Sequence, residues 1–163
     1  MNYIIRKAKR ADIPRIAEIL VFVKRISFFP IFKDEEYAFN ELQVLSVANE
    51  CAAPELLEQH WVYDDGGIIK GLMRIEGEEL ATLYVDHFFQ SQGIGARLLD
   101  FAVRECGVRF LWALEKNEGA VRFYARHGFL PSGERKLEEG TSEFLVRLVR
   151  SSERPAPDCR AGL

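Results

Sequence analysis

The sequence lacks the features of a membrane-spanning or nucleic-acid-binding protein. No apolar run approaches the roughly 20 residues that a transmembrane helix needs. The 22 Lys and Arg residues are outnumbered by 25 Asp and Glu residues, which leaves a net charge of −3. Such a balance offers no basic surface to nucleic acid or to an anionic membrane. The first residues alternate like a strand and lack the pattern of a signal peptide. We therefore expect neither a membrane nor nucleic acid as a partner.

Cysteine is scarce, and metal-ligand spacing is missing. Cys51, Cys106 and Cys159 form an odd and widely spaced set, so we expect no disulfide framework and a reducing, cytoplasmic location. Neither H-E-x-x-H nor C-x-x-C occurs, and no Ser-His-Asp arrangement can be argued. The sequence predicts no metal site, and we expect structural or exposed positions for its three histidines, His60, His87 and His127.

The composition is that of a globular protein. Of 163 residues, 48% are hydrophobic and 29% are charged, which suits one soluble domain with a real core. From Ser151 onward the sequence has no hydrophobic period and no core residues. We therefore expect a single domain over residues 1–150 and a flexible tail over residues 151–163.

The most informative stretch is Gln90–Leu99, which follows an apolar strand pattern over 80–85 and begins an amphipathic helix pattern. Gly93 and Gly95 thus lie where a strand turns into a helix. Free N–H groups and the positive end of the helix dipole meet there, and glycine lets a phosphate approach the backbone. The pattern predicts an anion cradle, and the alternative is a tight turn without a ligand. The segment lacks the Lys-Ser/Thr of a Walker loop and the third glycine of a dinucleotide loop, where it has Leu98.

Elsewhere the sequence alternates between strand and helix patterns. A helix starting after Asp12 is expected to be interrupted at 27–32, because Pro30 disfavours helix at the residue before it. A helix crossing between the strands at 80–85 and 110–114 predicts that these two are parallel. The remaining expected strands are 3–7, 61–63, 68–75, 133–137 and 142–148, and the other expected helices are 34–51, 94–106 and the one that Asn117 caps and Gly128 ends.

A second motif joins the glycine loop. Residues 90–95 fit Q-x-x-G-x-G/A, and residues 117–129 fit N-x-x-A-x-x-F-Y-x-x-x-G-F. In this order the two motifs resemble the GNAT superfamily of acyl-CoA N-acyltransferases, over roughly residues 3–150 and most weakly over 22–58. The resemblance implies an α/β fold with a mixed, mostly antiparallel sheet, a central splayed parallel pair and helices on both faces.

The resemblance also implies a reaction. It is the transfer of an acetyl group from acetyl-CoA to a primary amine of a small molecule or peptide, without a metal, and it is compatible with a homodimer. One alternative is a non-catalytic acyl-CoA-binding module on the same fold. Another is a general phosphate or nucleotide binder, against which the missing Lys-Ser/Thr counts. The acceptor itself cannot be read from the sequence.

The family pattern assigns cofactor contacts to both motifs and to the strand before the loop. Asn117 would cap its helix and contact pantetheine. A backbone N–H near Val85 would polarise the thioester carbonyl. The cofactor-binding residues implied are Leu83, Tyr84 and Val85, which would pair with pantetheine like a strand, the loop residues Gln90, Ser91, Gln92, Gly93, Ile94, Gly95 and Ala96, and Asn117 with Tyr124.

Acetyl transfer further needs a proton acceptor for the amine and a proton donor for the thiolate. Tyr124 matches the tyrosine that many family members place near the cofactor sulfur, and a phenol with a pKa near 10 can protonate a thiolate. The alternative is a buried aromatic residue with a satisfied hydroxyl. For the base, the candidates are Glu79, at the start of the strand before the loop, Glu115 and solvent. Glu79 could equally be a solvated turn residue beside Glu76 and Glu78.

The segment around 28–39 is rich in aromatic residues, more than a small core helix requires. By the resemblance it lies over the acceptor side. Core packing is the alternative, and exposure of a large apolar residue would be the informative finding. The aromatic residues are Phe28, Phe29, Phe32, Tyr37 and Phe39.

Overall fold

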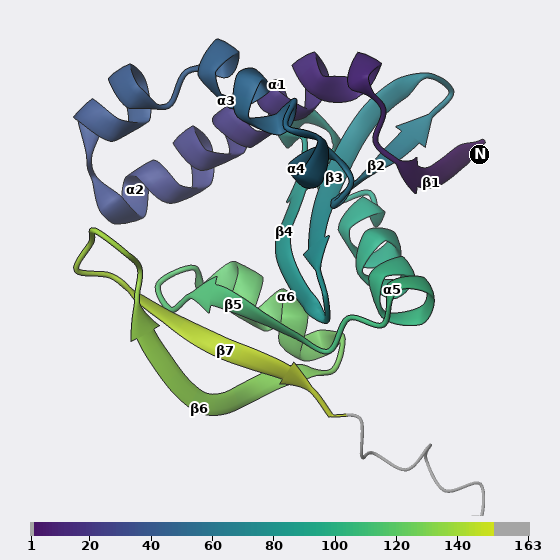
Figure 1. Ribbon diagram of the computed structural model, residues 1–163. Helices are drawn as coiled ribbons and strands as arrows, with labels where there is room; N and C mark the ends of the chain where they lie inside the picture. The colour runs from purple at the N-terminus through teal and green to yellow at the C-terminus, as the bar shows by residue number, and fades with distance from the viewer. Residues whose placement is uncertain (1, 152–163) are drawn as a thin grey trace, which may run out of the picture. The chain divides into compact units, whose positions relative to one another are not determined.

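The computed structural model describes residues 2–151. The chain divides into two compact units, one ending at Val108 and one beginning at Arg109 (Figure 1). Each unit has its own strands and helices. Of the expected tail, residues 152–163 lie outside the described residues.

The first unit is built on four antiparallel strands in the order β1-β2-β3-β4. Gly66 and Gly67 form the two-residue turn between β2 and β3, and both have positive φ, as a type I′ hairpin requires. The strand positions expected from the sequence are confirmed, and three of these strands run one to three residues longer. The strands are β1 (Tyr3–Lys7), β2 (His60–Asp65), β3 (Ile68–Glu76) and β4 (Glu79–Val85).

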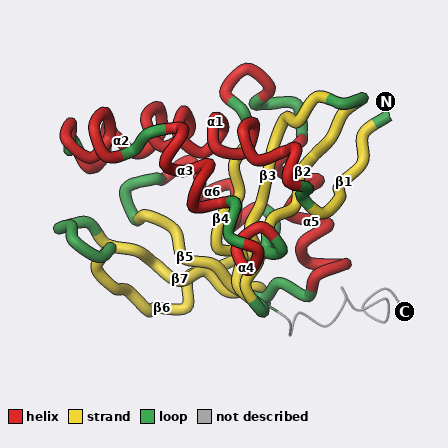
Figure 2. Tube along the Cα trace, turned by 45° about the horizontal axis from the view of Figure 1, so that its top comes forward, coloured by secondary structure: helices red, strands yellow, loops and turns green. Residues whose placement is uncertain are grey.

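Helix α1 (Ile13–Val23) packs its apolar stripe on one face of this sheet. Ile16 and Ile19 are fully buried there against Val62 and Leu72. Helix α3 (Val44–Cys51) lies beside α1 and adds Cys51 to the same core (Figure 2). A short helix, α4 (Pro54–Leu57), then leads into β2.

Helix α5 (Ile94–Cys106) covers the opposite face of the same sheet. Gly71 on β3 points toward α5, whereas its neighbour Leu72 belongs to the core under α1. A Cβ atom on Gly71 would lie 3.1 Å from Leu98 Cδ1 and 3.2 Å from Ile94 Cγ2. The glycine therefore allows the first turns of α5 to approach the sheet closely. Gly107 ends the helix in the left-handed conformation, as expected.

The segment between α1 and α3 differs from its prediction. The expected interruption at 27–32 is wrong: α1 continues as a π-helix, η2 (Lys24–Phe28), and then as α2 (Phe29–Phe32). Pro30 lies in the first turn of α2, directly after the π-helix, and its ring holds φ at a helical value. The chain leaves helix only at Lys33, with φ of 57°.

The single helix expected over 34–51 is also wrong. A π-helix, η3 (Glu36–Glu41), is followed by a break at Leu42 and Gln43 before α3 begins. Leu42 is buried, and Arg25 donates hydrogen bonds to the carbonyls of Ala38 and Leu42, both at 3.0 Å. These contacts satisfy carbonyls that the break leaves without helical partners, which is why a tertiary interaction overrides the local helix pattern.

The second unit has three antiparallel strands in the order β5-β7-β6 and one helix, α6, within its described part. The Asn117 side chain caps α6 by accepting a hydrogen bond from Ala120 N at 3.3 Å, as expected. Gly128 follows the helix with φ of 88°. The elements are β5 (Phe110–Leu114), α6 (Glu118–Arg126), β6 (Phe129–Leu137) and β7 (Phe144–Arg150).

Among residues 2–151, no helix has both the length and the apolar character to cross a bilayer.

The close approach at Gly71 leads to a test of the first unit. Gly71→Ala should lower the free energy of unfolding by about 1–3 kcal/mol, because the added methyl overpacks against Leu98 and Ile94. Urea unfolding measures the change. Gly119→Ala is the matched control: the space around it is open, and alanine in a helix should leave stability unchanged or raise it by up to about 1 kcal/mol. Equal effects at both positions would contradict this reading.

Candidate active site

The glycine loop connects β4 to α5 with two left-handed residues. After Val85 the chain passes through a short 3₁₀ turn, η4 (His87–Phe89). Ser91 then has φ of 62° and Gly93 has φ of 81°, and Gly93 is the N-cap of α5. The first hydrogen bond inside the helix is from Arg97 N to the Gly93 carbonyl, at 3.1 Å. The backbone N–H groups of residues 94–96 therefore point out of the start of the helix, without helical acceptors.

Arg97 adds a positive charge to this loop. Its Nη1 donates to the Gln92 carbonyl at 3.2 Å and to the Tyr63 hydroxyl at 3.3 Å, and its guanidinium lies 5.2 Å from the Tyr3 ring centroid. Within residues 2–151 it forms no ion pair with a carboxylate. The charge is thus available to an anion at the loop.

Arg97 is not among the residues predicted from the sequence. A signal was present, because an arginine near the start of a helix opposes the helix dipole and is disfavoured without a compensating anion.

Leu83, Tyr84 and Val85 form the end of β4 that leads into the loop. They lie opposite Met73, Leu72 and Gly71 of β3. The Tyr84 ring packs on the core below α1 and meets the Phe28 ring edge-on, with centroids 5.8 Å apart. The Gln90 side chain reaches back from the loop and donates to the Val85 carbonyl at 3.3 Å. The strand end and the loop are therefore joined directly.

Glu79 lies at the other end of β4. It is the first residue of the strand and sits opposite Glu76 of β3, beside the turn at Gly77. Six residues separate it from Val85, which corresponds to roughly 20 Å along a straight strand. The structure therefore does not bring Glu79 to the loop.

In the second unit, Asn117 and Tyr124 belong to the same short helix. The Tyr124 ring meets the rings of Phe123 and Phe129 edge-on, with centroid distances of 5.2 and 6.3 Å. Burial raises the pKa of Tyr124 well above the ordinary phenol value. At neutral pH its hydroxyl is protonated, as that of an ordinary tyrosine also is.

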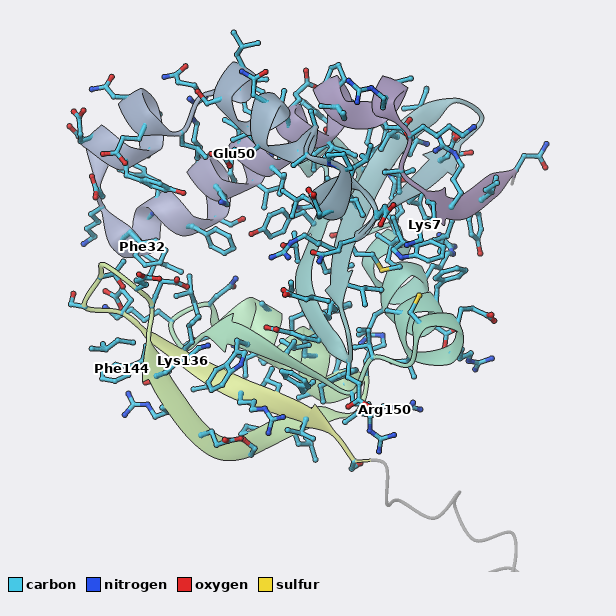
Figure 3. All side chains as sticks on the ribbon, in the orientation of Figure 1. Lys7, Phe32, Glu50, Lys136, Phe144 and Arg150 are labelled. Carbon is cyan, nitrogen blue, oxygen red and sulfur yellow. The ribbon has the colours of Figure 1, made fainter. Side chains whose placement is uncertain are left out.

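Glu115 follows β5 in the same unit and is held by Arg135. Arg135 Nε donates to Glu115 Oε2 at 2.7 Å and Arg135 Nη2 donates to Oε1 at 3.2 Å. The same guanidinium lies 4.0 Å from the ring centroid of Phe144, which is labelled in Figure 3. Both carboxylate oxygens of Glu115 thus already accept hydrogen bonds, although about half of the side chain is exposed.

A cavity of about 420 Å³ lies in the first unit between α1 and the residues that precede the loop. Its walls include Phe22 of α1 together with His87 and Phe88. Phe22 is half-exposed, and Phe88, at 85% exposure, projects into solvent. Of the aromatic residues singled out in the sequence, Tyr37 and Phe39 are exposed. These exposed apolar side chains exceed what core packing needs.

His60 is buried in the core of the first unit. Burial lowers the pKa of His60, whose Nδ1 lies 2.8 Å from the Leu56 carbonyl oxygen, so His60 is a neutral core residue. The described residues contain no group of three or more side chains that could hold a metal ion.

Comparison with known proteins agrees with these motifs. Residues 57–131 match the model of the acetyltransferase (GNAT) domain. A probable N-acetyltransferase of Mycobacterium tuberculosis is 30% identical in an alignment covering 78% of this chain and 80% of that protein. The chain belongs to the GNAT family of acetyltransferases. Another relative, the peptidyl-lysine N-acetyltransferase YiaC of Escherichia coli, is 27% identical over 126 residues, covering 77% of this chain and 82% of YiaC.

Solved GNAT-type structures share the fold. The apo form of YjaB from Escherichia coli matches 93% of this chain and 99% of its own with a TM-score of 0.76 and 22% identity. The putative acetyltransferase yncA of Salmonella typhimurium, solved with acetyl-CoA, matches 98% of this chain and 99% of its own with a TM-score of 0.66 and 20% identity. The expected fold class, an α/β fold with a mostly antiparallel sheet, is confirmed.

The left-handed Gly93 provides a test of the loop. Gly93→Val should weaken CoA binding for two reasons. Valine is strained at φ of 81°, and its side chain would displace the Arg97 guanidinium, because the guanidinium atoms lie 3.7 Å from the position of the added Cβ atom. Calorimetric titration with CoA measures the affinity. Gly107→Val, at the other end of α5 with φ of 70° and open space around it, carries the same backbone strain and should bind CoA as the parent does. Unchanged binding by folded Gly93→Val would exclude this loop as the anion site.

Proposed function

We propose that this protein transfers the acetyl group of acetyl-CoA to a primary amine of a peptide or small molecule, with a lysine side chain in a peptide as the first acceptor to test. The observation that carries the proposal is the loop: outward-facing amides at the start of α5, a left-handed Gly93 and an Arg97 charge that has no carboxylate partner among residues 2–151. Family membership supports acetyl transfer. The acetyl-CoA bound to yncA supports the donor, and the name of YiaC supports the acceptor.

The cofactor's pyrophosphate would lie on the amides of residues 92–96, where the helix dipole and Arg97 favour negative charge. Pantetheine would run along the end of β4, at Leu83, Tyr84 and Val85, and would meet Asn117. A backbone N–H near Val85 would stabilise the oxyanion that forms on the thioester carbonyl. These contacts account for binding and alignment, and proton transfers complete the reaction.

In the chemical step, the neutral amine nitrogen forms a bond to the acetyl carbon, and the carbon–sulfur bond breaks. Tyr124 would give its proton to the departing thiolate and regain one from solvent. The amine proton would pass to a base, for which Glu79, Glu115 and solvent are the candidates. Glu115 is tied to Arg135, and Glu79 sits far along β4 from Val85, so a water molecule would have to carry the proton to Glu79.

A ligand screen followed by turnover tests this function against its alternatives. Acetyl-CoA and CoA should raise the melting temperature, since a ligand that binds the native state stabilises it by ~2.7 kcal/mol at about 100 times its Kd. ATP should raise it much less. Thiol release should then require an amine, with lysine peptides, polyamines and free amino acids compared. Binding of acetyl-CoA without turnover on any amine would favour the non-catalytic module, and equal stabilisation by ATP would favour a general phosphate binder.

The acid role of Tyr124 has its own test. Tyr124→Phe keeps the ring packing on Phe123 and Phe129 and removes the proton donor. We expect kcat to fall by ~10²-fold or more, with little change in acetyl-CoA affinity. Tyr3→Phe, which removes a hydroxyl from β1, is the control and should keep the parent's kcat. A parental kcat for Tyr124→Phe in an assay limited by chemistry would remove Tyr124 from the acid role.

The base is tested by the pH dependence of kcat/KM in Glu79→Gln and Glu115→Gln. A carboxylate base works only when ionised, so the parent's rate should fall on the acid side as that carboxylate becomes protonated. We expect one of the two variants to lose this acidic limb and to need higher pH, where more of the amine is free. If both variants keep the parent's profile, neither carboxylate is the essential base, and solvent takes the proton.

A further inference from the structure

The residue between β4 and η4, Asp86, uses its two carboxylate oxygens in different directions. Oδ1 accepts a hydrogen bond from Phe88 N at 2.9 Å, which closes the turn η4. Oδ2 accepts one from Arg15 Nη2 on α1 at 2.8 Å. The Asp86 side chain is only 13% exposed. One carboxylate thus joins the segment that leads into the glycine loop to a helix about 70 residues earlier in the chain.

Arg15 meets this carboxylate from a fixed position. Its Nε donates to the Ile69 carbonyl of β3 at 3.1 Å, and its Nη1 contacts Glu18 one turn further along α1. The Arg15 side chain is 26% exposed, so its ion pair with Asp86 is partly shielded from solvent. Arg15 therefore ties α1, β3 and the start of the loop segment together through one planar group.

The segment after Asp86 is short and bound at several points. Asp86 N donates to the Lys70 carbonyl at 2.9 Å, and Lys70 Nζ lies 4.7 Å from the Phe89 ring centroid. Gln90 returns to the Val85 carbonyl. Only three residues separate Asp86 from Gln90, so a change in the direction of the chain at Asp86 moves the left-handed turn at Ser91 and Gly93 directly.

We infer that the Arg15–Asp86 ion pair positions the cofactor loop and thereby sets the affinity for acetyl-CoA. Neither Arg15 nor Asp86 lies on the glycine loop, and neither is among the residues proposed to contact the cofactor. The pair therefore acts through the backbone of residues 87–90. This inference rests on the proposed function, in which the amides of residues 92–96 hold the pyrophosphate. The cavity beside α1 gives these residues room to move when the pair is broken, because Asp86, His87 and Phe88 form part of its wall.

The test measures CoA affinity by calorimetry and steady-state kinetics together. Asp86→Asn keeps the acceptor for Phe88 N and removes the charge, and Arg15→Gln removes the partner. Each should raise the Kd for CoA and the KM for acetyl-CoA about tenfold, the effect of a coupling energy near 1.4 kcal/mol. At saturating acetyl-CoA, kcat should stay within about twofold of the parent. The double variant should bind no worse than either single variant, because one interaction has been removed in each.

Glu18→Gln is the matched control. It removes the other carboxylate partner of Arg15, on the same helix, without touching Asp86. It should leave the Kd for CoA unchanged. Melting temperatures show whether each variant is folded. If Asp86→Asn fails to fold, Arg15→Gln carries the test, and Asp86→Glu, which keeps the charge, should bind CoA more tightly than Arg15→Gln.

The outcomes separate the inference from the function on which it rests. If Asp86→Asn and Arg15→Gln bind CoA as the parent does while Gly93→Val loses binding, the loop is the site and the positioning inference is overturned. If Glu18→Gln weakens binding as much as Asp86→Asn, the effect belongs to α1 in general and the inference also fails. If the parent itself does not bind CoA, the proposed function fails first.

Discussion

The candidate site depends on one backbone constraint: the chain turns left-handed at Gly93, and α5 then begins with its amides facing outward. A helix always leaves its first N–H groups without internal partners, and here no side chain of the N-cap residue covers them. The first unit is arranged to hold this helix start. Gly71 lets α5 approach the sheet, Gln90 ties the loop to the end of β4, and Asp86 with Arg15 connects the segment before the loop to α1.

A positive side chain lies at the same helix start. The Arg97 guanidinium lies against Gly93 and donates to the Gln92 carbonyl, where it adds to the positive end of the helix dipole. In the second unit, burial disfavours charge. It raises the pKa of Tyr124 and so favours the neutral, protonated phenol. In the proposed reaction the anion site would hold the cofactor and the phenol would protonate the thiolate, and the amine proton needs a separate acceptor.

Local patterns predicted much of this molecule. The strands of the first unit, the glycine loop, the Asn117 cap and the end of α5 at Gly107 all depend on nearby residues, and their expected positions are confirmed. In the second unit, β6 begins at Phe129, four residues before the expected start at 133, and β7 runs over 144–150 where 142–148 was expected. The segment between α1 and α3 depends on distant ones. Arg25 supports the break at Leu42 through two backbone carbonyls, and neither hydrophobic period nor helix propensity contains that contact. Likewise the Asp12 carboxylate, just before α1, accepts hydrogen bonds from Arg6 and from Lys9 N and none from the first turn of that helix.

Only part of the candidate site was predictable from the sequence. The loop and Tyr124 belong to motifs of contiguous residues, so the sequence sufficed to nominate them. The roles proposed for Asp86 and Arg15 arise only when α1 and the loop segment are brought together, and no spacing along the chain indicates this contact. The base has no local signature either, since Glu79 and Glu115 are both carboxylates at strand ends.

The most direct measurement is a titration of the ¹⁵N-labelled protein with acetyl-CoA, followed by the backbone amide signals in NMR spectra. The account predicts that the largest shifts fall on Gln92–Ala96 at the start of α5 and saturate at one equivalent of ligand. Shifts confined to other parts of the chain, with the amides of residues 92–96 unchanged at saturation, would contradict the claim that this loop binds the cofactor.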